Sequence, residues 1–290
     1  MTPNHPSPPL VLTFAGSDPT GGAGIQADLL TIASLGCHPL SVITAITVQD
    51  SERVHSVNPV DPDWLEDQAR QVLEDMTVAA FKIGLIGSVE NVAAIAEVVS
   101  DYPHIPLVLD PVLAAGNGDE LAGAEIIAAI RELLLPQTTV LTPNSLEARR
   151  LVADTGDDDM MLADCAYRML ALGCEYVLVT GTHENTSQVV NNLYGPLGGG
   201  AAEDEAQDAK ERQIAVGLVR SDAWTRLSGS FHGSGCTLAA ALAAMLANGQ
   251  DVPAAAREAQ EYTWNALKHA FRPGMGQFLP DRFFWARRNA

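Results

Sequence analysis

A run of small and polar residues late in the chain holds the residue types best suited to chemistry. Residues 229–237 read Gly-Ser-Phe-His-Gly-Ser-Gly-Cys-Thr and lead into an alanine-rich apolar segment at 238–246. This pattern predicts a tight loop and then a helix, with Ser234 or Thr237 as the capping residue. The first turn of a helix offers unpaired N–H groups, and glycine lets an anion approach them closely. The loop therefore predicts an anion-binding site.

Cys236 falls in the first turn of that predicted helix, where the helix dipole favours a thiolate. It is therefore a candidate base or nucleophile. In the alternative interpretation, Gly233 and Gly235 only shape a turn, and Cys236 is a small buried apolar residue. The loop taken alone leaves both interpretations open.

A second glycine-rich loop, at 16–24, follows an apolar strand pattern. It is not a P-loop, because no lysine with a following serine or threonine comes after its second glycine. The dinucleotide fingerprint Gly22-x-Gly24-x-x-Ala27 does fit, with Asp50 as the acidic residue near the end of the next strand. This pattern makes a dinucleotide-binding oxidoreductase an alternative, although it gives the loop at Gly233 no role.

Apolar periodicity alternates between short strands and helices along most of the chain. Strands are predicted at 11–15, 40–48, 55–60, 79–83, 107–109, 139–141 and 176–179, and helices at 25–35, 64–73, 89–99, 122–135, 146–152, 161–172, 237–247 and 252–271. The alternation predicts an α/β fold with a mostly parallel central sheet. Segments at 188–193, 213–219 and 223–227 predict an antiparallel edge ribbon, and 195–212 a mobile acidic loop.

Polar residues follow several predicted strands, namely Asp18, Gln49, Asp110 and Asn144. Ligands of parallel sheets bind beyond the carboxyl ends of the strands, so we expect these side chains to converge on one crevice. Asn144 and Glu147, three residues apart, could order water around Mg²⁺, which takes few protein ligands. They could equally form a capping box at a helix start, and the two roles are compatible.

Composition limits the classes of partner. The 290 residues are 47% hydrophobic and include no evident linker, which predicts a flexible tail at 1–10 and a single domain at 11–290. A formal net charge of −19 disfavours nucleic acid and anionic membranes as partners. The N-terminus lacks the pattern of a signal peptide, and the four cysteines lack zinc-site spacing, so we expect a cytoplasmic protein with free thiols.

Six motifs, in this order, resemble the ribokinase-like superfamily, most closely its hydroxymethylpyrimidine kinase branch of thiamine biosynthesis. They are AGSDPTGGAGIQAD at 15–28, VITAITVQD at 42–50, KIGLI at 82–86, DPVL at 110–113, TPNSLEA at 142–148 and HGSGCT at 232–237. The last is the most telling, since related sugar kinases have aspartate in place of the cysteine. The resemblance spans nearly the whole chain and implies helices on both faces of the sheet.

The resemblance implies ATP-dependent phosphorylation of 4-amino-5-hydroxymethyl-2-methylpyrimidine to its monophosphate and then to the diphosphate. It implies Cys236 as the catalytic base, with the amides of Gly233, Ser234, Gly235 and Cys236 as the anion hole for the phosphoryl group. The implied pyrimidine contacts are Asp28 and Gln49 through hydrogen bonds, and Leu85, Val112 and Gly16.

For ATP and its phosphates the resemblance implies Asn144, Glu147, Thr180 and Gly181, with Asp110 and Glu147 near Mg²⁺, directly or through water. Many relatives carry a lysine before the glycine at 181 and another after Asp-Pro-Val. This chain has Thr180 at the first place and Ala-Ala-Gly-Asn-Gly at 114–118 at the second. Both lysines would have helped to hold phosphate, so the resemblance supports the second phosphorylation less directly than the first.

Two further functions compete with pyrimidine phosphorylation. Pyridoxal or pyridoxine phosphorylation is one, because a similar cysteine-bearing loop serves it in some relatives of the superfamily. A sensor that binds the pyrimidine without consuming ATP is the other. Of the seven histidines, only His183 and His232 fall in candidate site loops. The hydroxymethylpyrimidine kinase branch is often homodimeric, so the resemblance implies a homodimer.

Overall fold

The computed structural model describes residues 7–114, 121–153, 160–197 and 215–287. Its centre is a nine-stranded sheet in the order β3-β2-β1-β4-β5-β6-β7-β8-β9. The strands are β1 Leu10–Ser17, β2 His38–Gln49, β3 Val54–Pro59, β4 Val78–Ile83, β5 Leu107–Leu109, β6 Val140–Leu141, β7 Tyr176–Thr180, β8 Gln188–Pro196 and β9 Val216–Thr225.

Strands β2, β1, β4, β5, β6 and β7 run parallel, as the alternating pattern predicts. Strands β8 and β9 add the predicted antiparallel ribbon at one edge, and β3 pairs antiparallel with β2 at the other. The prediction of two separate segments at 213–219 and 223–227 is wrong, because β9 crosses both as one strand. Most of the predicted acidic loop at 195–212 lies outside the described residues. So do residues 115–118 of the segment after Asp-Pro-Val, where many relatives have a lysine.

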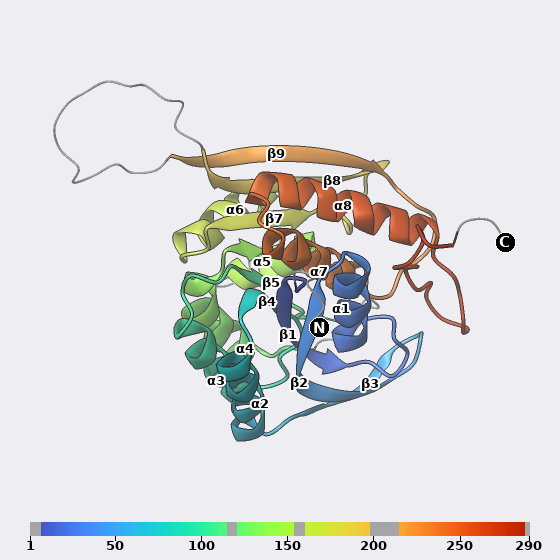
Figure 1. Ribbon diagram of the computed structural model, residues 1–290. Helices are drawn as coiled ribbons and strands as arrows, with labels where there is room; N and C mark the ends of the chain where they lie inside the picture. The colour runs from blue at the N-terminus through green and yellow to red at the C-terminus, as the bar shows by residue number, and fades with distance from the viewer. Residues whose placement is uncertain (1–6, 115–120, 154–159, 198–214, 288–290) are drawn as a thin grey trace.

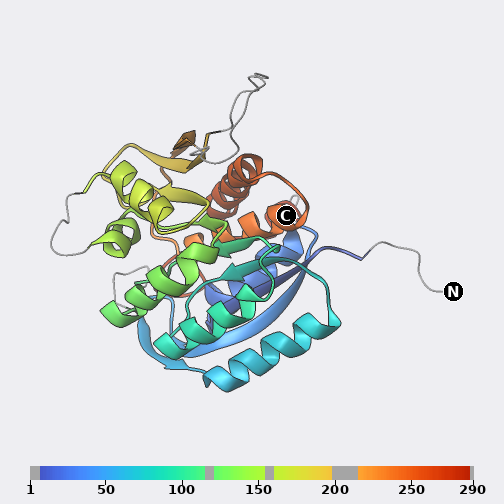
Figure 2. The ribbon, with the colours of Figure 1, turned by 90° about the vertical axis from the view of Figure 1, so that its left-hand side faces the viewer.

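Helices cover both faces of the sheet, as the resemblance implies. They are α1 Gly24–Ser34, α2 Pro62–Asp75, α3 Val89–Ser100, α4 Ala124–Ala129, α5 Ser145–Val152, α6 Leu162–Ala171, α7 Ser234–Ala247 and α8 Val252–Lys268. Helices α2 to α6 lie in front of the sheet in Figure 2, whereas α7 packs between α1 and α8 on the other face (Figure 1).

Two hydrophobic cores follow from strand periodicity. Neighbouring strand residues point to opposite faces, so Phe81 and Leu109 join the core under α2 to α6, while Ala80 and Val108 join the core under α7. The alanines of α7 are almost all buried, because a small side chain on every side lets this helix lie close to the sheet and to both neighbouring helices. This packing fixes the position of the start of α7.

Three predicted helix boundaries need correction. The predicted helix at 122–135 is interrupted, since α4 is followed by a π-helical turn at Ile130–Leu134 and a 3₁₀ turn at Leu135–Gln137. Helix α8 ends at Lys268, three residues before the predicted end. Helix α7 starts at Ser234, three residues before the prediction. No helix in the described parts of the chain is long and apolar enough to cross a membrane.

Candidate active site

A cavity of about 510 Å³ opens at the carboxyl ends of the parallel strands. Its wall follows the order of the sheet. Residues from β1, β2 and the segment after β4, such as Gly16, Gln49 and Leu85, form one half. Residues from the β7 to β9 edge and from α8 form the other half, and the start of α7 contributes Gly233 to Cys236 to the same wall. The cavity therefore has two sides that share one helix N-terminus.

The start of α7 is built without a capping side chain. Gly233 is the N-cap residue with φ of 78°, and a Cβ there would collide with the carbonyl oxygen of Gly22. The predicted caps are wrong: Ser234 is the first helical residue, and the Thr237 hydroxyl donates to the Gly233 carbonyl over 2.8 Å. The first turn carries no acidic residue. Its amides thus present the positive end of the helix to the cavity without a side-chain cap.

The start of a second helix, α1, lies on the cavity wall beside the start of α7. Gly24, the first residue of α1, lies beside Cys236, and its main-chain N–H acts to lower the pKa of the thiol. Gly24 has φ of 59°, and a Cβ there would collide with the Gly16 carbonyl. A Cβ at Gly22 would meet His232 and Leu279. The glycines of the dinucleotide fingerprint are therefore used for packing loop against loop.

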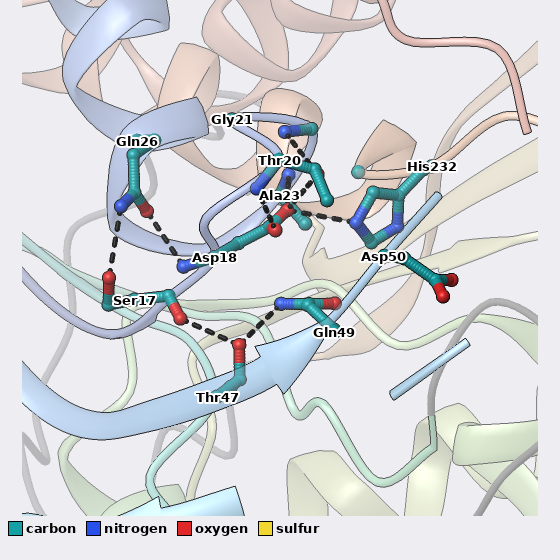
Figure 3. Close-up of polar contacts among 12 residues, drawn as sticks. Ser17, Asp18, Thr20, Gly21, Ala23, Gln26, Thr47, Gln49, Asp50 and His232 are labelled. Carbon is teal, nitrogen blue, oxygen red and sulfur yellow. Dashed lines mark hydrogen bonds and ion pairs between the residues drawn. The ribbon is translucent and has the colours of Figure 1, made fainter. Parts of the chain in front are cut away.

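The carboxylate of Asp18 lies at the start of α1 and binds the residues that precede this helix (Figure 3). Its carboxylate accepts hydrogen bonds from the Ala23 amide at 2.7 Å and the Thr20 hydroxyl at 2.9 Å, and it pairs with His232 Nε2 at 2.9 Å. Burial acts to raise the pKa of Asp18, but these hydrogen bonds outweigh it and hold the pKa below its ordinary value. Asp18 itself does not line the cavity, whereas His232 does.

Asp50 does not fill the place that the dinucleotide interpretation gives it. It is exposed, and its carboxylate accepts from the amides of Glu52 and Arg53 in the turn after β2 and pairs with His55 at 3.1 Å. Because a carboxylate of the chain occupies the start of α1 and Asp50 lies in a turn, the structure does not support the oxidoreductase alternative.

Gln49 lines the cavity at the end of β2, as predicted. Its Nε2 donates to Thr47 Oγ1 over 2.7 Å, and that hydroxyl donates to the Ser17 carbonyl over 2.7 Å. Figure 3 shows the amide oxygen of Gln49 on the side away from Thr47. Leu85, Val112 and Gly16 also line the cavity, as predicted. This half therefore combines apolar surface with one oriented amide, which suits a neutral ring with hydrogen-bonding edges.

Asp28 is not on the cavity wall. Its carboxylate is fully buried, accepts from the Thr13 hydroxyl over 2.6 Å and forms an ion pair with Lys82 Nζ at 2.9 Å. Burial favours the neutral amine, but the negative charges of Asp28 and its neighbours raise the pKa of Lys82 above its ordinary value. The placement does not support direct contact between Asp28 and a substrate. Lys82, which the sequence analysis quoted but gave no role, lines the cavity instead.

Asn144 and Glu147 form the capping box of α5. Asn144 Oδ1 accepts from the amides of Leu146 and Glu147, and Glu147 Oε2 accepts from the Asn144 amide over 3.0 Å. Both residues also line the cavity. The capping interpretation is therefore confirmed, and it leaves these side chains facing the ligand space.

Asp110 and Glu147 are the acidic side chains on the described part of the wall. Burial and the charge of Asp110 raise the pKa of Glu147 to about 8, and burial raises the pKa of Asp110 to about 6. Asp110 Oδ2 is buried without a hydrogen-bond partner. Among the described residues no group of three or more His, Cys, Asp or Glu side chains could hold a metal. Mg²⁺ needs only one or two carboxylates when water and phosphate supply the rest, so this pair fits it.

Cys236 lies beside Asp110 and is half-buried. Burial raises the pKa of its thiol to about 12, against the opposing effects of Lys82 and the Gly24 N–H. Loss of solvation thus opposes the thiolate that the sequence predicts at this helix start. The thiol is within hydrogen-bonding reach of the Asp110 carboxylate.

The other half of the cavity contains residues that the sequence analysis missed. Thr180 lines it as predicted, but Gly181 does not: its amide donates to Asn191 Oδ1, and its Cα packs against the main chain of Val190. The further wall residues there include Thr182, His183, Asn191, Trp224, Arg226, Gln260 and Trp264. Strand β9 and helix α8 bring most of these together from distant parts of the chain, so no local motif marks them.

Comparison with known proteins identifies the family. Residues 18–281 match the family model described as phosphomethylpyrimidine kinase. This chain belongs to the phosphomethylpyrimidine kinase family. It is 38% identical over 271 residues to a hydroxymethylpyrimidine/phosphomethylpyrimidine kinase of Streptomyces coelicolor, covering 93% of each chain.

Solved structures confirm the ribokinase-like α/β fold. A pyridoxal kinase of Bacillus subtilis in complex with ADP superposes with a TM-score of 0.80 at 29% identity, covering 97% of this chain and 100% of that one. A phosphomethylpyrimidine kinase of Clostridium difficile superposes with a TM-score of 0.71 at 30% identity, covering 89% of this chain and 99% of that one.

Proposed function

We propose that the protein uses ATP to phosphorylate 4-amino-5-hydroxymethyl-2-methylpyrimidine and then the resulting monophosphate, giving the diphosphate for thiamine biosynthesis. One observation carries the proposal: an uncapped helix start, beside Cys236, faces a cavity with an acceptor half at β1 and β2 and a donor half at β7 to β9. Family membership supports the chemistry, since the relative from Streptomyces coelicolor carries both kinase activities in its name.

The start of α7 supports phosphoryl transfer. A bond forms from the hydroxymethyl oxygen to the γ-phosphorus while the bond to the β-phosphate breaks and ADP leaves. The amides of Ser234, Gly235 and Cys236 stabilise the charge on the transferring oxygens. Cys236 takes the alcohol proton once its own proton has left, and Asp110 beside the thiol is a group to which that proton can pass.

The acceptor half suits the aminopyrimidine. Gln49, held by Thr47, offers an oriented amide for the ring nitrogens and the amino group, while Leu85 and Val112 contact the ring. Gly16 keeps the wall open beside Leu85, because a Cβ there would lie 3.0 Å from a Leu85 methyl group. Asp28 serves the site through Lys82 in this account.

The donor half takes ATP, with Asn144, Glu147 and Thr180 nearest the phosphates. Asp110 and Glu147 would hold Mg²⁺, in part through water, and the bound ion would neutralise phosphate charge. Thr180 stands where many relatives have lysine, so in this chain the helix start carries more of the phosphate binding. Gly181 lies off the described cavity wall and shapes the loop beside it.

An ADP-release assay with three acceptors tests the proposal. With hydroxymethylpyrimidine as acceptor, the enzyme should release two ADP per molecule of pyrimidine and form the diphosphate. With pyridoxal, or with no acceptor, it should release far less ADP. The fold similarity to a pyridoxal kinase makes pyridoxal the informative competitor. Preferential turnover of pyridoxal, or tight binding of the pyrimidine with no ADP released, would refute the assignment. Release of a single ADP per pyrimidine would refute the second phosphorylation, from the monophosphate to the diphosphate.

We also propose that the protein is cytoplasmic and that it forms a homodimer, of which the family resemblance implies the homodimer. Light scattering coupled to size-exclusion chromatography tests the oligomeric state directly. A mass of about twice the 30.7 kDa of the chain is expected, and the mass of one chain would contradict the dimer.

A further inference from the structure

The connection between β7 and β8, residues 181–187, forms part of the donor half. Thr182 and His183 from this connection line the cavity. Few main-chain hydrogen bonds hold it within itself: Glu184 N donates to the Gly181 carbonyl over 3.2 Å, and Thr186 N to the Glu184 carbonyl over 2.9 Å. A connection of this kind needs support from elsewhere to keep one shape.

Arg226 supplies that support from the residue after β9. Its Nε donates to the Thr186 carbonyl at 2.9 Å and Nη1 to the Thr182 carbonyl at 2.8 Å. Its Nη2 donates to the carbonyls of Glu184 at 2.8 Å and Gly181 at 3.4 Å. One half-buried side chain thus gathers four carbonyl oxygens of the connection around a single planar group.

Only arginine can make this arrangement. The guanidinium has five N–H donors in a fixed plane, whereas a lysine ammonium donates from a single nitrogen. The hydrogen bonds of Arg226 with described residues all go to main-chain carbonyls, and none of the ion pairs found among those residues includes it. Lys82, the other lysine or arginine on the described part of the cavity wall, is paired with Asp28.

We propose that Arg226 is a positioning residue for the phosphoryl donor, which holds residues 181–187 in the shape that receives the nucleotide. It acts through the connection, since its donors are taken up by carbonyls. This inference rests on the proposed function, because it takes this half of the cavity as the nucleotide site. It also explains how the donor half is organised in a chain with threonine at position 180.

The test compares Arg226→Lys and Arg226→Ala with a control on the preceding strand β9, Arg220→Lys. Arg220 is bonded to Asp222 at 2.7 Å and does not line the cavity. ADP affinity is measured by titrating the fluorescence of Trp224 and Trp264, which do line it, and KM is measured for ATP and for the pyrimidine. Both Arg226 variants should weaken ADP binding about tenfold or more and raise KM for ATP similarly, as loss of a charge-assisted hydrogen bond implies.

The KM for the pyrimidine should stay unchanged in both variants, and Arg220→Lys should match the parent. If Arg226→Lys binds ADP as the parent does, the fork of donors is unnecessary and the proposal is overturned. An equal rise in both KM values would also overturn it, because that indicates general damage to the fold. A parent protein that binds ADP but phosphorylates no pyrimidine refutes the proposed function and leaves the ADP comparison valid.

Discussion

Cys236 receives opposing influences whose balance decides its protonation. The first turns of α1 and α7 and the charge of Lys82 favour the thiolate, while burial and the carboxylate of Asp110 favour the thiol. Burial prevails in the ligand-free protein, so the pKa of the sulfur stands at about 12. The sulfur is therefore a strong base once its proton has been removed.

Cys236→Ser should lower kcat by about 10²- to 10⁴-fold, the usual contribution of a positioned general base, with little change in KM for ATP. Steady-state ADP release measures both constants. Cys37→Ser is the matched control, because Cys37 is buried at the C-terminal end of α7 with Asn248 and the Ala244 carbonyl as partners. A Cys236→Ser protein with the parent kcat would show that the sulfur takes no part in proton transfer.

The raised pKa of Glu147 predicts that the stability of the protein depends on pH. This pKa rises from 4.5 to about 8 on folding. The contribution of Glu147 to the unfolding free energy is therefore fully present below pH 4.5 and is lost as pH rises through 8. Glu147→Gln keeps an acceptor for the Asn144 amide but cannot ionise. Between pH 5.5 and 8.5 without Mg²⁺, the variant should gain at least ~1 kcal/mol in unfolding free energy relative to the parent.

Urea unfolding of both proteins across this pH range measures the difference. The comparison with the variant removes the effects of titrating groups that do not interact with Glu147, such as His183, whose pKa is lowered by burial and by Arg226. A difference in unfolding free energy that stays constant with pH would contradict the ionisation of Glu147 described here.

At the residue scale the sequence placed three of the four polar residues after parallel strands correctly on the cavity wall, while Asp18 does not line it. Gln49, Asp110 and Asn144 reach the wall because parallel strands end at one edge of the sheet. Asp28 and Lys82 show the limit of that reasoning. The motif contained both residues, but only the packing of α1 against β4 shows that the carboxylate lies beneath the amine.

The start of α7 is the element on which the site depends. Its place is set by Gly233, whose positive φ and close approach to the Gly22 carbonyl exclude a side chain. The sequence predicted a helix here but placed its start too late, because it expected a hydroxyl cap. A glycine cap in the left-handed region gives no such side-chain signal. The sequence likewise gives no local signal that β9 is one continuous strand, because its continuity depends on pairing with β8.

Gly233→Ala should destabilise the protein and abolish activity, whereas Gly249→Ala should affect stability only. Both glycines have positive φ, 78° and 83°, so each variant incurs about 1–2 kcal/mol of backbone strain. A methyl group added at Gly249 would meet nothing within 4 Å, while one added at Gly233 would also collide with Gly22. Thermal unfolding and ADP release measure the two effects, and a fully active Gly233→Ala protein would contradict the role of this turn.

Across the whole molecule, contacts between distant segments complete the cavity. Buried Arg282, near the C-terminus, donates to the carbonyls of Gly21 and Gly22 and to the Thr237 hydroxyl, which joins the loops before α1 and α7. Phe278 pairs with Phe231 in the same region. The parallel sheet and its ribbon could be predicted from periodicity, but these contacts could not, because they join residues 45 to 261 positions apart in the sequence.

The net charge of −19 is a property of the whole molecule that the site must overcome. A polyphosphate approaches a surface of like charge, so local groups must provide the attraction. The described cavity supplies the start of α7, the charge of Lys82, and a carboxylate pair suited to a divalent cation. These groups gather where the two halves of the cavity meet.

A crystal structure of the complex with hydroxymethylpyrimidine and a non-hydrolysable ATP analogue tests the central claim most directly. We expect γ-phosphate oxygens on the amides of Ser234 to Cys236 and a hydroxymethyl oxygen within about 3.5 Å of the Cys236 sulfur, on the side of Gln49. A nucleotide bound at the start of α1, or a pyrimidine whose hydroxymethyl group points away from the sulfur, would contradict it.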